Sequence, residues 1–375
     1  MELEQTRTWA EIDLGNLEHN YRALRSCAPD SRFLGVVKAN AYGHGAVPVA
    51  RRLEKLGADY LAVACLNEAL ELRQASVRMP ILILGTTPPA LAEQVVAAGL
   101  TQAVFTMELA RALSAAAGKL GMTAKIHIKM DTGMSRLGLL CHDPRAAAGE
   151  AAALCALPHL EHEGIFTHFA NADGDEDYTM LQLTRFLDAL EELEKSYRLT
   201  FEIRHCAASA AVLNYPCTHM DMVRPGIALY GHYPDPSCEG LDGPGLLPVM
   251  TLKSRVAAVR DLPAGTPVSY GCTAAFGADG GRVAVLPIGY ADGLHRALSG
   301  RGSVFLGGQS RPIMGRVCMD MCMVGLEDGA EVRPGDVAEV FGPRMPVERH
   351  ADLAGTIQYE LLCAVSPRVP RIYLG

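Results

Sequence analysis

The stretch Leu34-Gly-Val-Val-Lys-Ala-Asn-Ala-Tyr-Gly-His-Gly45 decides how this chain folds and where its chemistry lies. A short apolar run, typical of a buried β-strand, ends at Lys38, and a tyrosine and a Gly-His-Gly loop follow directly. A lysine at the mouth of a buried strand loses hydration, which disfavours its charged form. Such an amine can attack an aldehyde and form a Schiff base. The alternative is a strand-end lysine that extends to water, and this segment alone leaves both open.

The composition is that of a soluble globular protein. The chain has 375 residues, of which 49% are hydrophobic and 20% charged, with a formal net charge of −8. The negative charge and the lack of a long Lys/Arg run argue against a nucleic-acid or anionic-membrane partner. No apolar stretch reaches the ~18 residues that a membrane span needs. The N-terminus carries no apolar signal core, so we expect a cytoplasmic protein.

The eleven cysteines are scattered, and many of them lie in apolar segments. No Cys-x-x-Cys pair or His/Cys ligand cluster is present, so neither a disulfide framework nor a metal site is expected. Buried, reduced thiols in a reducing compartment fit this pattern better.

Short apolar runs alternate with helical patterns between about residues 30 and 235. Eight such runs, rich in Val, Ile, Leu and Ala, are typical of parallel strands that are buried on both faces. This alternation predicts a (β/α)8 TIM-type barrel, with a doubly wound sheet as the weaker alternative. The predicted strands span residues 33–38, 60–65, 81–84, 102–105, 125–130, 164–168, 203–206 and 223–230, and the helices between them include 47–56, 66–74, 89–98, 107–117 and 180–197.

Chemistry-bearing residues gather at the ends of these predicted strands. Barrels of this kind place their active sites at the C-terminal ends of the strands. Independent structural residues would not be expected to collect there. The residues at or just after strand ends are Lys38, Arg136, His168, Ser209 and Arg224.

Residues 233–248 are dense in Pro, Gly and Asp and indicate a domain boundary. Beyond them, strand-like runs are separated by Gly-rich turns, which predicts a mainly antiparallel β domain. We expect a barrel over residues 12–238, and a β domain formed by residues 1–11 and 245–375. Strands are predicted over residues 251–259, 267–270, 282–287, 302–306, 313–324 and 336–341, with one helix over 347–363. Residues 8–13 are also predicted to form a strand, and the pattern alone leaves open which of the two domains it belongs to.

Eight motifs in order along the chain resemble those of alanine racemases, pyridoxal-5′-phosphate enzymes of fold type III. The resemblance runs almost from end to end, and the order makes it far more specific than any single motif. The motifs are Val-Val-Lys38-Ala-Asn-Ala-Tyr-Gly-His-Gly, Lys129-Met-Asp-Thr-Gly-Met-Ser-Arg136-Leu-Gly, Thr167-His168-Phe-Ala, Met222-Val-Arg224-Pro-Gly-Ile-Ala-Leu-Tyr-Gly, Val268-Ser-Tyr270-Gly, Gly289-Tyr290-Ala-Asp-Gly, Gly315-Arg-Val-Cys318-Met319-Asp320, and Tyr359-Glu-Leu-Leu with Pro-Arg-Val-Pro-Arg after it.

The resemblance implies an isomerase that interconverts L-alanine and D-alanine and supplies D-alanine for peptidoglycan. Lys38 would hold pyridoxal 5′-phosphate as a Schiff base and act as the base for the D-enantiomer. Tyr270 would be the base for the L-enantiomer, on the opposite face. Because Tyr270 and Met319 would come from the partner subunit, the resemblance implies a head-to-tail homodimer with shared active sites.

The resemblance also assigns the cofactor contacts. Arg224 would face the pyridine nitrogen and, since an arginine does not give up its proton, leave that nitrogen unprotonated. His168 would support Arg224 by hydrogen bonding, with His205 behind it. The phosphate would be held by Tyr42, Ser209, Tyr359 and the backbone N–H groups of Gly226 and Ile227.

The remaining implied roles concern the substrate. Arg136 and the backbone of Met319 would bind the substrate carboxylate. Lys129 would be carbamylated and would orient Arg136, although bound chloride would serve a similar purpose. Cys318 and Asp320 would support the site, Asp320 by positioning Tyr270, and no metal is expected. The access corridor would be lined by Asp173, Tyr290, Arg296, Arg316 and Ile357.

Three other interpretations fit the sequence less well. Related decarboxylases place a carboxylate near the ring nitrogen and carry a Glu-Pro-Gly-Arg-like motif, which this chain lacks. Broad-spectrum or serine racemases open the pocket where this chain keeps Tyr359. A non-catalytic cofactor carrier would lack the second domain.

One position departs from the family pattern. The family often has Asn where this chain has Ala208, and we expect this chain to retain its cofactor slightly less well for that reason.

Overall fold

The structure is a computed structural model that describes residues 6–240 and 243–375. It divides into two compact units. The barrel unit comprises Leu17–Ala41 and Ala46–Leu247, and the sheet unit comprises residues up to Asn16, Tyr42–Gly45 and Pro248–Gly375. Residues 12–16 and 42–45 therefore group with the sheet unit, whereas the sequence had suggested that they belong to the barrel domain.

The barrel unit contains the predicted ring of parallel strands, which confirms the fold class. The ring closes where β10 pairs with β2 and where the backbone N–H of Arg224 donates to the carbonyl of Ala207 at 2.9 Å. In order around the ring, the strands are β10 (Met222–Val223), β2 (Arg32–Val36), β3 (Tyr60–Val63), β4 (Ile81–Ile83), β5 (Thr101–Val104), β6 (Ala124–Asp131), β8 (Leu160–Phe166) and β9 (Ile203–His205), with the two-residue β7 (Leu139–Leu140) paired to β6.

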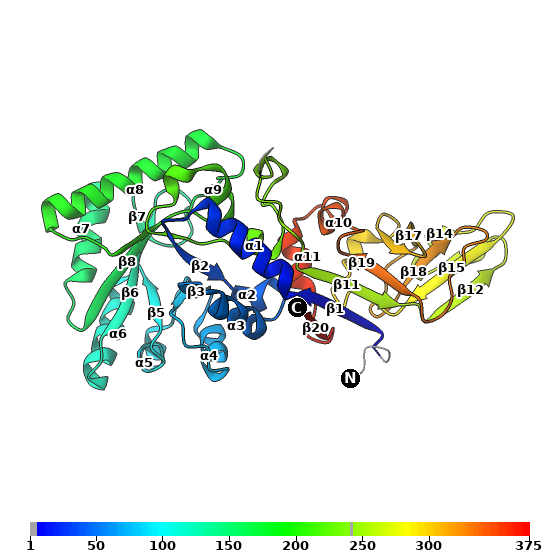
Figure 1. The fold of residues 1–375 in the computed structure, drawn as a ribbon, viewed down its shortest axis with the longest axis horizontal. Helices are drawn as coiled ribbons and strands as arrows, with labels where there is room; N and C mark the ends of the chain where they lie inside the picture. The colour runs from blue at the N-terminus through cyan, green and yellow to red at the C-terminus, as the bar shows by residue number, and fades with distance from the viewer. Residues whose placement is uncertain (1–5, 241–242) are drawn as a thin grey trace. The chain divides into compact units, whose positions relative to one another are not determined.

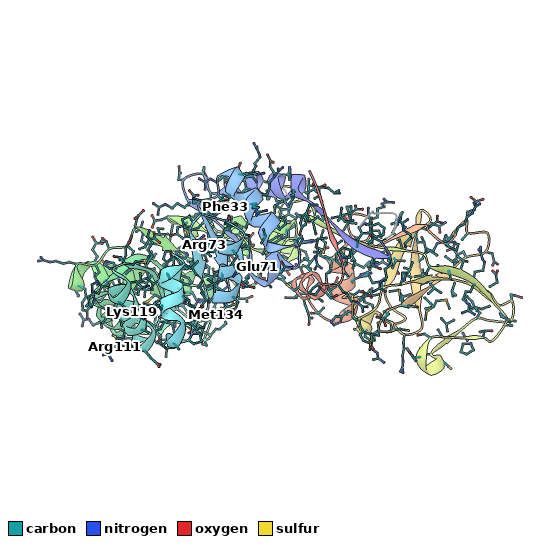
Figure 2. All side chains as sticks on the ribbon, turned by 90° about the horizontal axis from the view of Figure 1, so that it is seen from below. Phe33, Glu71, Arg73, Arg111, Lys119 and Met134 are labelled. Carbon is teal, nitrogen blue, oxygen red and sulfur yellow. The ribbon has the colours of Figure 1, made fainter. Side chains whose placement is uncertain are left out.

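Helices cover the outside of these strands, as Figure 1 shows. Two sets of polar contacts between neighbouring elements involve residues labelled in Figure 2. Arg73 donates to four backbone carbonyls in the connections that precede β4 and β5, and Lys119 pairs with Glu93 of the adjacent helix at 2.6 Å. The helices are α1 (Leu14–Cys27), α3 (Ala46–Leu56), α4 (Leu66–Gln74), α5 (Ala92–Ala97), α6 (Met107–Leu120), α7 (Pro144–Cys155), α8 (Glu176–Tyr197) and the short α9 (Ser209–Asn214).

The prediction of the last barrel strand, residues 223–230, is mostly wrong. Of residues 223–230, only Val223 lies in β10, and Ile227–Tyr230 form a 3-10 helix. Pro225 has no N–H to donate to a ladder, and Gly226 turns the chain at φ −112° and ψ −96°. The apolar run 227–230 is buried as predicted, but as a helical turn.

The sheet unit is built on one large and mainly antiparallel sheet. Its only parallel pair among the described residues joins β1 to β20, so the N-terminal strand lies in this sheet and not in the barrel. The strands are, in sheet order, β12 (Ala258–Leu262), β15 (Gly281–Leu286), β18 (Cys322–Leu326), β17 (Gln309–Met314), β16 (Ser303–Leu306), β19 (Val337–Phe341), β11 (Met250–Arg255), β1 (Thr8–Asp13) and β20 (Arg371–Leu374), beside a small hairpin of β13 (Pro267–Val268) and β14 (Ala274–Ala275).

Glycines break two elements that the sequence predicted as continuous. The predicted strand 313–324 is interrupted at Gly315, where φ is +68°, and becomes the ends of β17 and β18. The predicted helix 347–363 is two helices, α10 (Val347–Ala354) and α11 (Gln358–Ala364). Gly355, at φ +70°, ends the first of them in the left-handed conformation. Among the residues described, no helix has the length and apolarity needed to span a membrane.

Candidate active site

The chain turns left-handed directly after Lys38. The strand β2 ends at Val36, and the short element α2 (Lys38–Tyr42) has φ of +53° to +54° at its three central residues. A left-handed turn costs an L-residue roughly 1 kcal/mol or more at each position, so this segment is held against its own preference. The sequence predicted an apolar strand ending at Lys38, and this turn is why the strand is shorter than predicted.

Two side chains of the barrel unit hold this turn. The carboxylate of Glu68, on α4, accepts the backbone N–H of Ala39 at 2.6 Å and that of Ala64 at 2.7 Å. The side chain of Asn40 accepts the N–H of Ala46, the first residue of α3, at 2.8 Å. These bonds tie the lysine-bearing turn to the ends of β3 and the start of α3, and they offset part of its strain.

A cluster of cationic groups surrounds Lys129, which is only 6% exposed at the C-terminal half of β6. Burial is the main cause that lowers the pKa of Lys129 to about 7. The charges of Arg224, Arg136 and Lys38 act in the same direction, and Asp131 opposes them. Four of the sequence-predicted residues therefore lie within electrostatic reach of one another.

Arg224 is buried in the barrel, and its hydrogen-bond partners among the described residues are all neutral groups. Its guanidinium contacts Nδ1 of His205 at 2.9 Å and Nδ1 of His168 at 3.2 Å, and donates to the carbonyls of Thr167 at 3.0 Å and Cys206 at 3.1 Å. Burial lowers the pKa of Arg224 to about 10, which leaves it protonated at neutral pH, and burial likewise holds the pKa of both histidines well below its usual range. A guanidinium donates through every N–H, so both histidines must accept through Nδ1.

The ring of Phe166 lies close to both buried cations. The Lys129 ammonium is 4.6 Å from the ring centroid and the Arg224 guanidinium carbon 5.5 Å. The imidazole of His205 stacks on the same ring at 4.7 Å and an interplanar angle of 7°. The aromatic face attracts both cations and packs His205 in place.

The loop that carries Arg136 is organised by Asp131 at the end of β6. Its Oδ1 accepts the backbone N–H groups of Gly133, Met134 and Ser135 at 2.9 to 3.0 Å, and its Oδ2 accepts that of Arg136 at 3.0 Å. Burial raises the pKa of Asp131, but the four N–H donors outweigh it and hold the pKa below its usual range. The Arg136 side chain itself is exposed.

Helix α8 connects this loop to the segment that carries His168. The Gln182 amide donates to Oγ1 of Thr132 at 3.2 Å and to the carbonyl of His168 at 3.3 Å. Arg185 donates to the carbonyl of Thr132 at 2.8 Å. Both site-bearing loops are thereby fixed to one rigid element.

The predicted phosphate residues of the barrel unit also meet. Ser209 Oγ accepts the backbone N–H groups of Gly226 at 2.9 Å and Ala228 at 3.3 Å, and Ile227 begins the 3-10 helix between them. Ala208 precedes α9 without a side-chain cap. A serine hydroxyl beside backbone N–H groups at a tight turn suits a phosphate. Together with the excess of cations, this donor set fits an anionic cofactor such as pyridoxal 5′-phosphate.

Tyr270 lies in the sheet unit, in a tight turn between β13 and β14. It is 70% exposed, and three residues beside it have positive φ: Ser269 at +68°, Gly271 at +75° and Cys272 at +52°. Ser269 Oγ donates to the carbonyl of Arg316 at 2.6 Å and fixes the turn. A side chain at Gly271 would meet the Arg316 guanidinium at 3.1 Å, so the turn packs closely on that arginine.

The segment Cys318–Asp320 adjoins this turn. Cys318 Sγ lies 3.5 Å from Ser269 Oγ, and Met319 is 54% exposed. Asp320 does not act on Tyr270 through any hydrogen bond of the described residues. It accepts instead from Arg368 at 2.7 Å, which also binds Asp292.

The other predicted residues divide between the units. Tyr42 and Tyr359, both in the sheet unit, have ring centroids 6.1 Å apart. Of the predicted corridor residues, Asp173 is exposed in the barrel unit, and the rest are exposed or half-buried in the sheet unit, namely Tyr290, Arg296, Arg316 and Ile357.

Sequence reasoning missed several residues of this site. Glu68 and Asp131 act on backbone N–H groups, which no residue pattern reveals. His127, by contrast, stands two residues from both Lys125 and Lys129 on a predicted strand, and this period of two places all three on one face. That alternation was a usable signal for a polar barrel interior.

Comparison with known proteins agrees with this geometry. The family model "Alanine racemase, N-terminal domain" matches residues 12–234, and "Alanine racemase, C-terminal domain" matches residues 249–373. The chain belongs to the alanine racemase family. Members are pyridoxal-phosphate-dependent isomerases that interconvert L- and D-alanine and provide D-alanine for peptidoglycan.

Individual relatives match over nearly the whole chain. The alanine racemase of Desulforamulus reducens is 46% identical over 98% of this chain and 99% of its own length. Among solved structures, an alanine racemase of Clostridium difficile is 37% identical, with a TM-score of 0.93 over 99% of this chain and 96% of that one. The alanine racemase of a D-cycloserine-producing Streptomyces lavendulae is 40% identical, again with a TM-score of 0.93, over 99% of this chain and 97% of that one.

We predict that Asp131→Ala releases the Arg136 loop. Four backbone N–H groups of this loop lose the buried carboxylate that accepts them, so the free energy of unfolding should fall by about 2 kcal/mol and the KM for alanine should rise. Denaturant unfolding and steady-state kinetics measure the two effects. Asp143→Ala, which removes the carboxylate that caps helix α7 and does not bind the Arg136 loop, should lower stability without changing KM; an equal KM change in both variants would contradict a specific role for Asp131.

We predict that Glu68→Ala lowers the rate of racemisation about tenfold or more, because the left-handed turn that presents Lys38 loses the anchor at Ala39. The matched control is Glu71→Ala on the exposed face of the same helix, labelled in Figure 2. Steady-state kcat of both variants, compared with wild type, tests this. Equal activity in the two variants would show that the turn holds its shape without Glu68.

Proposed function

We propose that this chain racemises alanine at a site formed by two copies of itself, with pyridoxal 5′-phosphate bound at Lys38. The observation that carries the proposal is the placement of Lys38 and Arg224 just beyond the ends of the neighbouring strands β2 and β10, with only neutral groups bonded to Arg224. A buried guanidinium, rather than a carboxylate, at the position that would face the ring nitrogen of the cofactor suits racemisation better than decarboxylation or transamination.

The cofactor would be held from both ends. Ser209 and the N–H groups of Gly226 and Ile227 would bind its phosphate, assisted by Tyr42 and Tyr359, and Arg224 would face its ring nitrogen. When bound, the cofactor supplies an aldehyde that condenses with amines and a ring that withdraws electrons from the substrate's α-carbon. Arg224 stays protonated and would only donate a hydrogen bond to that nitrogen, so the nitrogen would accept it and remain unprotonated. The ring would then be a weak electron sink, which limits side reactions.

Racemisation requires a proton to leave one face of the α-carbon and another to arrive on the opposite face. We assign the amine of Lys38 to the face that serves the D-enantiomer and the phenolate of Tyr270 to the face that serves the L-enantiomer. When Tyr270 removes the proton, Lys38 delivers one, and the reverse direction exchanges their roles. One proton is taken and one is given in each turnover, so no outside acid or base is consumed.

Substrate orientation would come from Arg136 and the backbone of Met319, which would bind the carboxylate. Tyr359 would keep the pocket small enough to favour alanine over larger amino acids. We place Tyr270 and Met319 in the partner subunit of a head-to-tail homodimer, where their exposed side chains would be covered. Such an enzyme would supply D-alanine in the cytoplasm.

Mixing two inactive variants tests this shared site. Lys38→Ala and Tyr270→Phe should each lose nearly all racemase activity as pure proteins. After unfolding and refolding an equal mixture, half of the dimers are mixed, and each mixed dimer has one site with both bases intact. The mixture should therefore regain about a quarter of wild-type activity, measured as D-alanine formed from L-alanine.

Two other results would contradict the shared site. If the mixture stays inactive although mixed dimers are present by native mass spectrometry, both bases belong to one chain. If wild-type holoenzyme forms no D-alanine, the proposed racemase function itself fails.

We further propose that Lys129 carries a carbamate. A neutral, buried amine adds CO2 with release of one proton, and the resulting anion would balance Arg136 and Arg224. The pKa of about 7 means that the amine is neutral above pH 7 and protonated below it. Carbamylation should therefore rise with pH through this range and fall in acid.

Labelled bicarbonate measures this modification. With 13C-bicarbonate present, wild-type protein at pH 8 should show a carbamate carbon signal that weakens toward pH 6 and is missing from Lys129→Ala. A carbamate signal that persists in Lys129→Ala, or its absence in wild type at pH 8, would contradict the assignment. Chloride-dependent activity without that signal would favour a bound chloride instead.

A further inference from the structure

A chain of buried side chains runs from Arg224 into the interior of the barrel. The Arg224 guanidinium contacts His205 Nδ1 at 2.9 Å, and His205 Nε2 contacts His127 Nδ1 at 2.8 Å. His127 Nε2 then contacts Glu163 Oε2 at 3.2 Å. Both histidines are fully buried and Glu163 is 8% exposed, so water does not compete for these bonds. No step of the reaction assigned above uses His127 or Glu163.

The chemistry of the end groups fixes the direction of every hydrogen bond. Arg224 can only donate, so His205 must accept through Nδ1 and carry its proton on Nε2. His127 must then accept through Nδ1 and donate through Nε2. The acceptor at the end is Glu163, because an ionised carboxylate only accepts. One tautomer of each histidine satisfies the whole chain.

Glu163 is held as the charged terminus of this chain. Burial alone would raise the pKa of Glu163, but hydrogen bonds from His127, Lys125 and Tyr60 outweigh it and lower the pKa to about 2. Lys125 approaches Oε1 at 2.6 Å, and the Tyr60 hydroxyl donates to Oε2. Burial also holds the pKa of His127 below its usual value, which keeps the imidazole neutral.

The barrel backbone makes room for this arrangement. The pairing of β6 with β8 shifts register between Ile126 and His127, opposite Gly164. A Cβ at Gly164 would lie 2.6 to 2.8 Å from three ring atoms of His127, and that ring cannot turn aside without breaking its bonds to His205 and Glu163. The chain of hydrogen bonds through His127 therefore requires a residue without a side chain at position 164.

We infer that Glu163 is a positioning residue for the reaction: its negative charge acts through His127 and His205 on the hydrogen bond that holds the Arg224 guanidinium in place. The inference rests on the proposed function, since Arg224 matters there as the group facing the cofactor ring. Aligned hydrogen bonds polarise one another, so the charge on Glu163 strengthens the bond that His205 makes to Arg224.

The first test measures the tautomers directly in apo and holo wild-type protein. Histidine labelled with 15N distinguishes a protonated ring nitrogen from an unprotonated one, and the His127→Asn variant identifies the His127 signals by their loss. We expect both His127 and His205 to carry one proton on Nε2 and none on Nδ1. A proton on Nδ1 of either residue would overturn the inference, whether or not the protein proves to be a racemase.

The second test removes the charge. Glu163→Gln removes the charge that polarises the chain, so the 15N–H signals of His127 and His205 should shift as their hydrogen bonds weaken. The value of kcat for alanine should fall about tenfold, with KM changed less than about twofold, because Arg224 and not the site of the substrate carboxylate is disturbed. The matched control is Glu161→Gln, the same change two residues earlier on β8 at an exposed side chain, which should leave tautomers and kcat unchanged.

Wild-type 15N–H signals of His127 and His205 together with wild-type kcat in a folded Glu163→Gln variant would overturn the inference. If Glu163→Gln does not fold, Gly164→Ala takes its place, because it displaces the His127 ring and leaves the carboxylate intact. It should lower kcat in the same way and lose the Nε2–H signal of His127. Unchanged kcat and tautomers in Gly164→Ala would count equally against the inference.

Discussion

The barrel interior is organised around a buried guanidinium, that of Arg224, which pairs with no carboxylate in the part of the chain that the structure describes. Moving such a cation out of water costs several kcal/mol, and four neutral acceptors around Arg224 recover part of that cost. The face of Phe166 adds an attraction that needs no negative charge. A direct carboxylate would bind Arg224 more tightly, but it would also neutralise the charge that we propose faces the cofactor ring.

Strand geometry explains how these groups come together. Alternate residues of β6 face the same way, which brings Lys125, His127 and Lys129 to one side of the strand at three depths. Lys129, the nearest of the three to the C-terminal end of β6, joins the cationic cluster, and His127 joins the buried hydrogen-bonded chain. A single strand thus contributes to both the cluster and the chain.

Much of the fold and site followed from the sequence, for identifiable reasons. Short Val/Ile/Leu runs predicted the parallel ring, and quoted motifs located Lys38, Arg136, His168 and Arg224, which the structure brings into one cluster. Predictions from the apolar pattern failed where a single proline or glycine changes the backbone conformation. Gly355 ends a helix whose apolar pattern continues, and Pro225 ends β10 although an apolar run follows.

The contacts that hold the site were the least predictable. Glu68 binds backbone N–H groups of Ala39 and Ala64, and only the folded backbone defines those partners. Glu163 and His127 lie far apart in sequence and are paired across a register shift that residue patterns do not encode.

The protonation of the cofactor ring nitrogen tests the account most directly. With 15N-labelled pyridoxal 5′-phosphate bound to the wild-type protein, the account predicts an unprotonated ring nitrogen throughout the neutral pH range. A protonated pyridinium would contradict it.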